Sequence, residues 1–395
     1  MLEWISASEK DRRQKGQMMQ SPWIEDERCT ACGACMNACP VDALFLDSDS
    51  CGFSHPQIGR GCIDCGLCKK VCDSRANQSL GGFEAPRVYA AWSRQESLRF
   101  ESTSGGLFSE LALEVLRRGG CVYGAFYNDD NMVSCGSASD ETGLAKLRQS
   151  KYVQSDIGYA FRKVESDLDS GLQVLFCGCP CQVAGLKAFL GKNCTNLLTV
   201  DFICRGVNSP KAYRSWLNEI EEQKGAKAKR VWFKYKSGGW KKSPKCTKVE
   251  FEDGTHRVFD QEGNLYMIGY LGYNLYIRPS CSACEFKGLP RCSDLTLADF
   301  WGLDKSLDDD KGASLLLVNT EKGFDIFRSI ENQIVAYKRN MSEVLSGNMC
   351  LEKSVNFNPK SSDFLEMLDY LSFSKAFQKY TKKSLLRRIA SWLLG

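Results

Sequence analysis

Eight cysteines between residues 29 and 72 constrain this chain more than any other feature. They form two runs of equal spacing, in which three cysteines stand three residues apart and a fourth follows four residues later. This spacing is typical of loops that hold 4Fe-4S clusters, where the fourth cysteine of each run binds the cluster of the other run. We therefore assign one cluster to Cys29, Cys32, Cys35 and Cys72, and a second to Cys39, Cys62, Cys65 and Cys68.

Gly33 and Gly66 occupy the same place in the two runs and allow the tight turn that a loop around inorganic sulfide needs. Zinc is the main alternative metal, but zinc sites use pairs of cysteines separated by a longer gap. A disulfide framework fits eight thiols at these spacings poorly. One departure from the repeat is Asp73, which stands where the first run has Pro40. The pattern predicts a ferredoxin-like module over residues 26–75, after an N-terminal extension over residues 1–25.

Composition limits the remaining classes of function. With 21 cysteines in 395 residues, the chain is too long to be a small disulfide-stapled domain. Residues 1–20 are charged and lack the apolar core of a signal peptide, so we expect a cytoplasmic setting with free thiols. A net charge of +4, without a basic stripe, argues against a nucleic-acid partner. Only two histidines occur, which argues against a histidine metal site or a Ser-His-Asp triad.

After a Gly- and Pro-containing linker over residues 76–86, the pattern changes to alternating strands and helices. We expect strands at 87–92, 121–127, 172–177, 197–204 and 313–319, and helices at 107–118, 157–168, 181–190, 210–223 and 322–332. This rhythm predicts an α/β layer with a substantially parallel sheet. In residues 229–259 the pattern of apolar residues is shorter than in the preceding stretch and more typical of β-strands. The predicted domains are 87–224 and 225–345, followed by a helical tail over 346–395.

A second, scattered set of cysteines lies where strands end or loops turn. Cys181 opens the helix after one expected strand, Cys204 ends the next strand, and Cys281 and Cys284 form a Cys-x-x-Cys pair. Because parallel strands bring their carboxyl ends together, these four thiols are candidates for a third 4Fe-4S cluster. Zinc remains an alternative for such a split site. Further candidate ligands nearby are Cys177, Cys179 and Cys292, whereas we interpret Cys51, Cys121, Cys135, Cys194, Cys246 and Cys350 as structural thiols.

The turn Thr103-Ser104-Gly105-Gly106 precedes a helix and follows a strand. Such a turn presents N–H groups at a positive helix end, which suits a phosphate or pyrophosphate. A plain N-cap at Ser104 is an equally good interpretation of the residues alone. The turn is neither a GxGxxG fingerprint nor a Walker loop.

Several motifs, in this order, resemble the coenzyme F-420 hydrogenase/dehydrogenase beta-subunit family. They are residues 104–106, 119–124, 150–155, 178–182, 201–206, 278–284 and 299–302, and the resemblance as a whole runs from about Cys29 to about Asn319. A bacterial branch of this family carries an N-terminal two-cluster module, as here. The resemblance implies a mixed α/β flavin-binding domain after the ferredoxin-like module, with FAD near Ser104, Gly105, Gly106, Lys151, Tyr152 and Gln154. It also implies a third cluster on Cys181, Cys204, Cys281 and Cys284.

Two positions depart from the family pattern. Cys179 replaces the usual threonine of a Gly-Thr-Pro-Cys motif, which adds an alternative ligand. Arg205 replaces the usual histidine of Cys-His-Gly, so a cation that holds its charge stands beside the cluster or flavin. We name Lys151, Arg205 and Asp299 as candidate catalytic residues. The alternative for Lys151 is an ordinary surface lysine. Asp299 and Trp301 are candidates for shaping the substrate face, and the alternatives are that Asp299 is an acid at the end of a strand and Trp301 an aromatic residue of the core.

The sequence therefore predicts an iron-sulfur flavoprotein oxidoreductase that exchanges electrons with a protein partner and acts on an unknown hydride carrier or organic substrate. One alternative is an electron-transfer subunit without its own substrate, either in a larger redox complex or associated with polysaccharide biosynthesis. Another is an iron-sulfur protein that senses redox state. Residues 381–394 form a basic amphipathic pattern, which either contacts a membrane surface or packs on its own domain.

Overall fold

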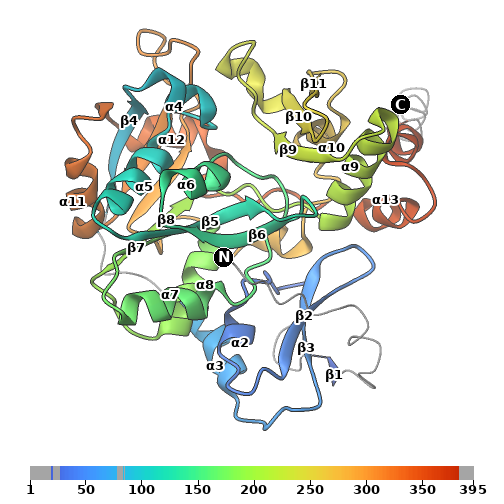
Figure 1. The fold of residues 1–395 in the computed structure, drawn as a ribbon, viewed down its shortest axis with the longest axis horizontal. Helices are drawn as coiled ribbons and strands as arrows, with labels where there is room; N and C mark the ends of the chain where they lie inside the picture. Colours follow the sequence, from blue (N-terminus) through green and yellow to red (C-terminus); the bar gives the residue numbers. More distant parts are fainter. Residues whose placement is uncertain (1–18, 21–26, 78–82, 84, 382–395) are drawn as a thin grey trace, which may run out of the picture.

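The computed structural model describes residues 19–20, 27–77, 83 and 85–381. The cysteine-rich module lies along the lower edge of the molecule in Figure 1. Its strands form a small antiparallel sheet in the order β1-β3-β2, and each cysteine run continues into a short helix. These elements are β1 (Met19–Gln20), α2 (Ala34–Asn37), β2 (Leu44–Ser48), β3 (Ser54–Ile58), α3 (Leu67–Asp73) and the 3-10 helix η1 (Ser74–Asn77).

A large mixed sheet organises the rest of the described chain. In spatial order its strands are β14 (Ile334–Arg339), β4 (Arg87–Ser93), β13 (Ser314–Val318), β12 (Leu295–Asp299), β8 (Leu197–Phe202), β7 (Val174–Cys177), β5 (Cys121–Tyr127) and β6 (Val133–Ala138). The neighbours β5, β7, β8 and β12 run parallel, whereas the remaining pairs are antiparallel. The mixed α/β class is confirmed. The expectation of a substantially parallel sheet is wrong outside the central strands, because β6, β13 and β14 return as antiparallel neighbours.

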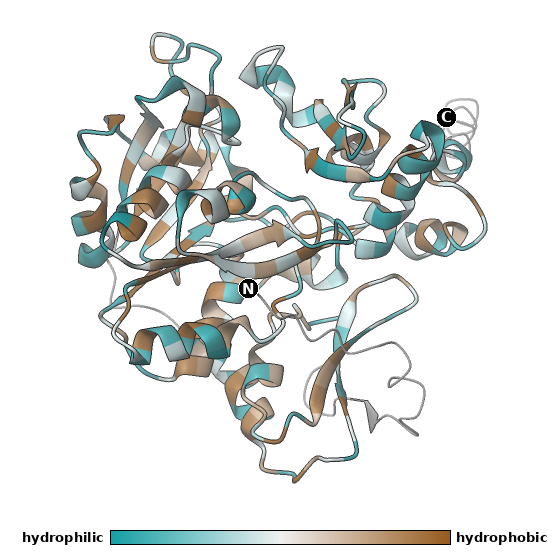
Figure 2. Ribbon diagram, in the orientation of Figure 1, coloured by the Kyte–Doolittle hydropathy of each residue, from teal (hydrophilic) through white to brown (hydrophobic). Residues whose placement is uncertain are grey.

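Helices cover both faces of this sheet (Figure 1). Apolar residues of α5 (Leu107–Arg117), α6 (Glu141–Leu147) and α11 (Glu321–Ser329) pack on one face, and those of α7 (Ala160–Asp169) and α8 (Pro180–Leu190) pack on the other. Figure 2 shows the hydrophobic residues concentrated along the strands and the inner sides of these helices. The cysteine-rich module joins the core of the second face, since Cys32, Ala34 and Val71 pack with α7 and α8.

A second sheet, β9 (Ala228–Trp232), β10 (Thr247–Phe251) and β11 (His256–Phe259), is antiparallel and stands beside the large one. Its core is aromatic and includes Tyr213, Trp216, Phe233 and Tyr266. The remaining elements are α4 (Glu96–Glu101), α9 (Pro210–Lys224), η2 (Trp240–Lys245), α10 (Leu265–Tyr273), η3 (Pro279–Ala283), α12 (Met341–Gly347), η4 (Met349–Leu351) and α13 (Ser361–Met367).

The predicted domain boundary near residue 225 separates stretches that share one sheet, because β12, β13 and β14 join strands from 87–202. The extension over 1–25 and the basic pattern over 381–394 fall almost entirely outside the described residues. Within the described residues, the helices are too short or too polar to cross a bilayer.

Candidate functional site

The two cysteine runs have the same local geometry. In each run, the N–H two residues after the first cysteine donates to its sulfur at 3.4 Å, from Ala31 to Cys29 and from Asp64 to Cys62. The glycine that begins each helix is left-handed, with φ of +78° at Gly33 and +72° at Gly66. Loops that point N–H groups at sulfur are the arrangement that iron-sulfur ligation needs.

The first predicted set of thiols is gathered in the interior. Cys29 and Cys32 are buried, and Cys35 and Cys72 are half-buried. Burial, followed by the charges of the other three sulfurs, raises the pKa of Cys35 well above its usual value. The last helix of the module therefore brings Cys72 back to the three thiols of the first run. A cluster of iron would offset the cost of deprotonating these crowded thiols.

The second predicted set lies at the surface. Cys62 and Cys65 are exposed and Cys68 is half-buried, whereas Cys39 packs against Cys68 in a small apolar cluster. Burial and the nearby sulfurs of Cys65 and Cys62 raise the pKa of Cys68. The two sets thus share a geometry but differ in their exposure to solvent.

Among the described residues, no group of three or more His, Cys, Asp or Glu side chains is spaced to hold a single metal ion. A 4Fe-4S cube places each of its four thiolates on a different iron, so its ligands stand further apart than those of one ion. The four-thiol sets fit the chemistry of a cube in donor type and number.

The scattered cysteines also come together. Cys181 lies in the first turn of α8, Cys204 follows β8, and Cys281 and Cys284 lie on and just after η3. All four line one cavity of about 40 Å³, which we call the thiol cavity. Burial raises the pKa of Cys284 to about 11, and the sulfurs of Cys181 and Cys204 contribute to this shift. The carboxyl ends of neighbouring strands meet here, as parallel topology dictates.

The alternative ligands fall in different places. Cys179 lines the thiol cavity, whereas Cys177 lines only a larger cavity beside it. Cys292 lines neither and donates to the carbonyl of Pro180 at 3.4 Å. Cys350, which sequence reasoning assigns as a structural thiol, lines both cavities. No sequence signal marks Cys350, because its neighbours in space come from distant segments.

The larger cavity has a volume of about 670 Å³, within the range of cofactor sites. Its lining includes most of the residues predicted for flavin or catalysis: Ser104, Gly106, Lys151, Tyr152, Arg205 and Asp299. Gly105 and Gln154 are absent from this lining. Gly105 is packed under the loop, where an added Cβ would collide with the carbonyl of Ala91, and Gln154 lines the thiol cavity instead.

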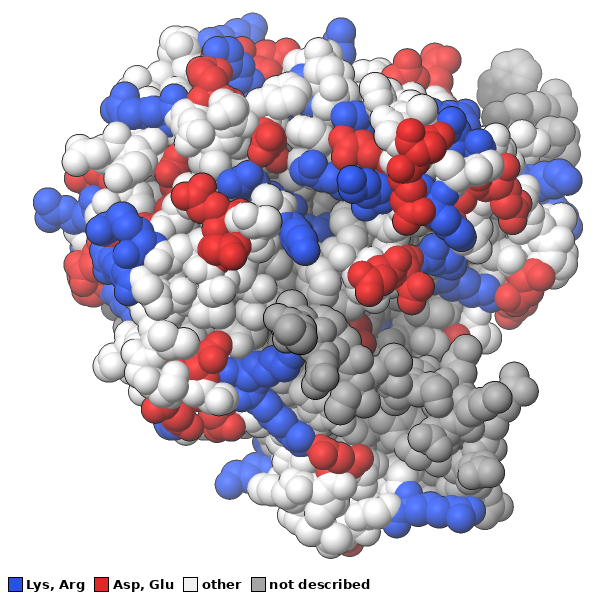
Figure 3. Space-filling model, viewed as in Figure 1, with Lys and Arg blue, Asp and Glu red and all other residues white. Residues whose placement is uncertain are grey.

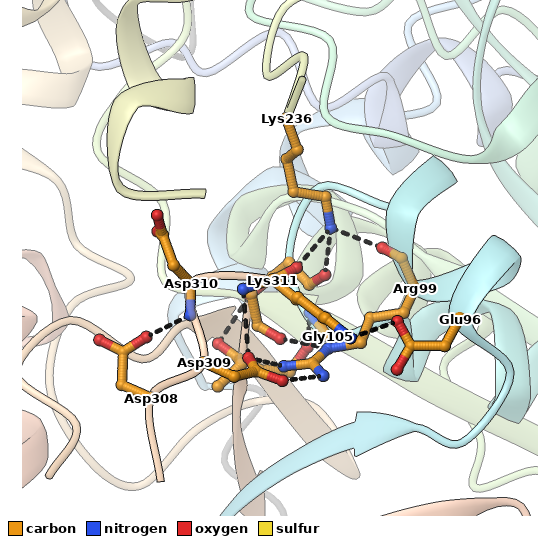
Figure 4. Close-up of polar contacts among 12 residues, drawn as sticks. Glu96, Arg99, Gly105, Lys236, Asp308, Asp309, Asp310 and Lys311 are labelled. Atoms are coloured by element: carbon orange, nitrogen blue, oxygen red, sulfur yellow. Dashed lines mark hydrogen bonds and ion pairs between the residues drawn. The ribbon is translucent and has the colours of Figure 1, made fainter. Parts of the chain in front are cut away.

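The buried cations Lys236 and Arg99 lie beside the turn that contains Gly105 (Figure 4). The Lys236 ammonium donates to the carbonyls of Ser104 at 2.8 Å and Lys311 at 3.1 Å, and also to that of Arg99. Arg99 in turn makes a bidentate ion pair with Asp309 at 2.6 and 2.8 Å. Burial, together with the nearby Arg99, lowers the pKa of Lys236 to about 7. Nothing in the local sequence distinguishes Lys236 from any surface lysine of a β-like stretch.

The candidate catalytic side chains line the large cavity and make different contacts. The Lys151 ammonium donates to three consecutive carbonyls, those of residues 147–149, at 2.8–3.3 Å. Burial lowers the pKa of Lys151 to about 7, and the charge of Arg230 adds to this effect. Arg205 donates to the carbonyls of Tyr270 and Leu271, so its guanidinium is held against α10.

Asp299 forms an ion pair with Lys234, a residue that sequence reasoning missed. Although burial opposes it, the carboxylate of Asp299 raises the pKa of Lys234, so this lysine stays charged. The Lys234 ammonium also lies 5.3 Å from the ring of Trp301, which stacks on Trp240 with ring centroids 4.5 Å apart. This end of the cavity therefore combines an ion pair with an aromatic face.

The two cavities share a wall. Both are lined by Ser155, Cys179, Gln182, Cys204, Arg205, Gly206, Val207 and Cys350. The face in Figure 3 has a central hollow, and basic and acidic side chains alternate around it. A group bound in the thiol cavity would thus be separated from a group in the large cavity by single side chains.

Residues 171–343 match the family model for the C terminus of the coenzyme F420 hydrogenase/dehydrogenase beta subunit, and residues 22–45 match a 4Fe-4S binding domain. Residues 171–343 therefore contain a domain of the coenzyme F420 hydrogenase/dehydrogenase beta-subunit family. A solved structure of a xenon-derivatized F420-reducing NiFe hydrogenase complex from Methanosarcina barkeri is similar at 18% identity and a TM-score of 0.46. The alignment covers 76% of this chain and 91% of that one. No curated protein matches.

The match to the beta-subunit family begins just before β7 and ends within α12, so it includes Cys181, Cys204, Cys281, Cys284, Arg205 and Asp299. The 4Fe-4S domain match covers the first cysteine run through Cys39. The matched segments thus contain the four scattered cysteines of the thiol cavity and the first run of the module.

Proposed function

We propose that this protein is an iron-sulfur flavoprotein oxidoreductase that passes electrons between 4Fe-4S clusters and FAD. The observation that carries this proposal is the wall shared by the thiol cavity and the large cavity. A redox group in each cavity would lie close enough for direct electron exchange. The cysteine-rich module packs on α8, whose first turn contains Cys181, and so supplies the route by which electrons reach this wall.

Three clusters are proposed, one in each four-thiol set. Cys29, Cys32, Cys35 and Cys72 would hold the first, and Cys39, Cys62, Cys65 and Cys68 the second. The third would use Cys181, Cys204, Cys281 and Cys284, since these four thiols converge on one cavity. Cys179 and Cys350 line the same cavity and would act as neighbours of the cluster rather than ligands.

FAD is proposed for the large cavity. When bound, FAD supplies exchange between one-electron carriers and two-electron hydride transfer. The turn before α5, held rigidly by Lys236 and Ser314, offers backbone N–H groups at a helix N-terminus to the pyrophosphate. Arg205, a permanent cation on the shared wall, would stabilise negative charge there.

The substrate is proposed to occupy the end of the cavity that contains Asp299, Lys234 and Trp301. An aromatic face beside an ion pair suits a planar organic hydride carrier, and the family name makes coenzyme F420 one candidate. Lys151, with a pKa of about 7, is a proton donor or acceptor near neutral pH if its ammonium leaves the carbonyls that hold it.

A second candidate function is an electron-transfer subunit without its own substrate. The observation that favours it is the exposure of Cys62 and Cys65, which leaves the second cluster accessible to a partner protein. The name of the family also describes a beta subunit.

Anaerobic purification with iron, sulfide and flavin quantified tests the proposal. We expect about twelve irons and one FAD per chain, as three four-iron clusters require. About eight irons would remove the third cluster, and no FAD released on denaturation would refute the flavin assignment. Protein that holds FAD but reduces no hydride carrier without a second polypeptide would favour the electron-transfer subunit.

A further inference from the structure

Arg75 is a buried arginine at the contact between the cysteine-rich module and α8. It lies on η1, directly after α3, and is 6% exposed. Its guanidinium donates to the hydroxyl of Thr30 at 2.9 Å and to the sulfur of Cys32 at 3.5 Å. Its Nε donates to the carbonyl of Cys72 at 3.1 Å. These contacts hold the cation against two thiols of the first set.

The charge of Arg75 is offset by sulfur. Within the described part of the chain, no carboxylate forms an ion pair with Arg75, and the sulfurs of Cys32, Cys72 and Cys181 would stabilise its charge once they are deprotonated. Its other close neighbour is the ring of Phe286, 5.9 Å from the guanidinium carbon. Because an unpaired buried charge costs several kcal/mol, the site is matched to a negative charge that the thiolates supply.

Arg75 also lies between two of the thiol sets. Cys32 and Cys72 belong to the first set and Cys181 to the third, and Cys181 interacts in addition with the hydroxyl of Thr30. Helix α8 can pack close to the first thiol set because Gly185, one turn after Cys181, has no side chain. A Cβ there would lie 2.9 Å from the sulfur of Cys32.

We propose that Arg75 is a positioning residue that raises the reduction potentials of the first and third clusters, and so draws electrons from the exposed second cluster into the interior. This inference rests on the proposed cluster assignments. Reduction adds one negative charge to a cluster, and a buried cation beside it stabilises the reduced form through a medium of low dielectric constant. The second cluster is exposed, so water screens it from the same charge.

A structural role alone would predict a different result. Arg162 on α7 also ties the module to the α/β domain, since its Nε donates to the carbonyl of Asn37 at 2.7 Å. However, the Arg162 guanidinium forms an ion pair with Asp42 at 2.7 Å and its side chain is one-third exposed. Arg162→Gln therefore removes an anchor whose charge is already compensated, and it serves as the matched control.

The experiment is an anaerobic reductive titration of the purified holoprotein, followed by electron paramagnetic resonance, for the wild type, Arg75→Gln and Arg162→Gln. In Arg75→Gln we expect two of the three cluster potentials to fall, each by about 59 mV or more, which is a tenfold loss in the equilibrium constant for a one-electron reduction. The potential of the second cluster stays at the wild-type value in Arg75→Gln, and the potentials of the first and third clusters stay at the wild-type values in Arg162→Gln. Unchanged potentials in iron-loaded Arg75→Gln protein would overturn the proposal.

Arg75→Lys keeps the test decisive if Arg75→Gln loses iron. Lysine retains the charge but not the forked hydrogen bonds, so we expect potentials near those of the wild type even where iron content falls. Potentials that fall in Arg75→Lys would assign the effect to hydrogen bonding and overturn the charge proposal. Iron and flavin are quantified on the same samples. Wild-type protein with about eight irons would refute the third cluster, while a lowered potential of the first cluster in Arg75→Gln would still support the role of Arg75 there.

Discussion

The two cysteine runs are a natural comparison, because they share spacing and local geometry but not environment. Both have a left-handed glycine and an N–H···S contact of 3.4 Å at equivalent positions. The first run is enclosed by α7 and α8, whereas Cys62 and Cys65 of the second are exposed. Ligand spacing therefore determines the loop, and the surrounding protein determines whether a cluster there would be an interior carrier or a surface contact.

The largest difference between the runs is expected from removing one ligand in each. Cys32→Ser and Cys65→Ser should each lose about four irons, because each breaks one four-thiol set. Cys32 also packs in the core with α8, so Cys32→Ser should lower the thermal unfolding midpoint well below that of Cys65→Ser. Iron analysis and calorimetry check this. Equal midpoints would mean that the buried run does not stabilise its contact with α8.

Controlled oxidation should remove iron from the two thiol sets in the order of their exposure to solvent. When the loaded protein is exposed to air in the presence of an iron chelator, the first four irons should leave from the set with exposed Cys62 and Cys65. Mass spectrometry of alkylated thiols, sampled over time, identifies which cysteines become free. If Cys29 and Cys32 were alkylated first, the burial of the thiols would not determine which cluster is lost first in air.

The two glycines give a matched pair of smaller changes. Alanine at either position adopts an unfavourable left-handed conformation, which costs about 1–2 kcal/mol. At Gly33 the added Cβ would also lie 3.0 Å from Ile157, whereas nothing lies within 4 Å of that of Gly66. We expect Gly33→Ala to lose about 1–3 kcal/mol more of the free energy of unfolding than Gly66→Ala, from anaerobic urea titrations. The same loss in both variants would contradict the predicted contact with Ile157.

The smallest difference is expected between variants of Asn37 and Lys70, which stand two residues after the third cysteine of each run. The Asn37 amide donates to the carbonyls of Gly33 at 2.9 Å and Gly158 at 2.8 Å and is buried, whereas Lys70 is exposed. Asn37→Ala should lower the free energy of unfolding by about 1–3 kcal/mol, and Lys70→Ala should change it by less than about 0.5 kcal/mol. Urea titrations of both variants measure the difference.

Sequence reasoning is strongest where local spacing carries the information. The strand and helix rhythm between 87 and 224 corresponds to β4, α5, β5, α7, β7, α8, β8 and α9. It is weakest where distant segments meet. Strand β6 is not predicted because Val133–Ala138 has few apolar residues, and β13 is predicted as a strand without its antiparallel pairing to β4 and β12. Pairing across more than 200 residues leaves no mark in local periodicity.

In the candidate site, too, the sequence identifies residues that belong to local motifs and misses those whose roles depend on distant segments. Ser104, Lys151 and Asp299, which were named from the sequence, line the large cavity, whereas Gly105 and Gln154 do not. Lys234, Lys236 and Arg75 were missed because a buried cation cannot be told from a surface one without its surroundings. Their roles arise from carbonyls, carboxylates and thiolates contributed by other segments.

The position of β12 has a consequence for how the chain is made. This strand lies between β8 and β13 in the sheet, yet it begins at Leu295, long after β8 ends at Phe202. The cysteine-rich module leaves the ribosome before the α/β domain, and Arg278, whose Nε donates to the carbonyl of Cys29 at 2.7 Å, follows that cysteine 249 residues later. We therefore expect nascent chains that end before β12 to keep an open strand edge at β8, and to depend on chaperones until translation supplies its neighbour.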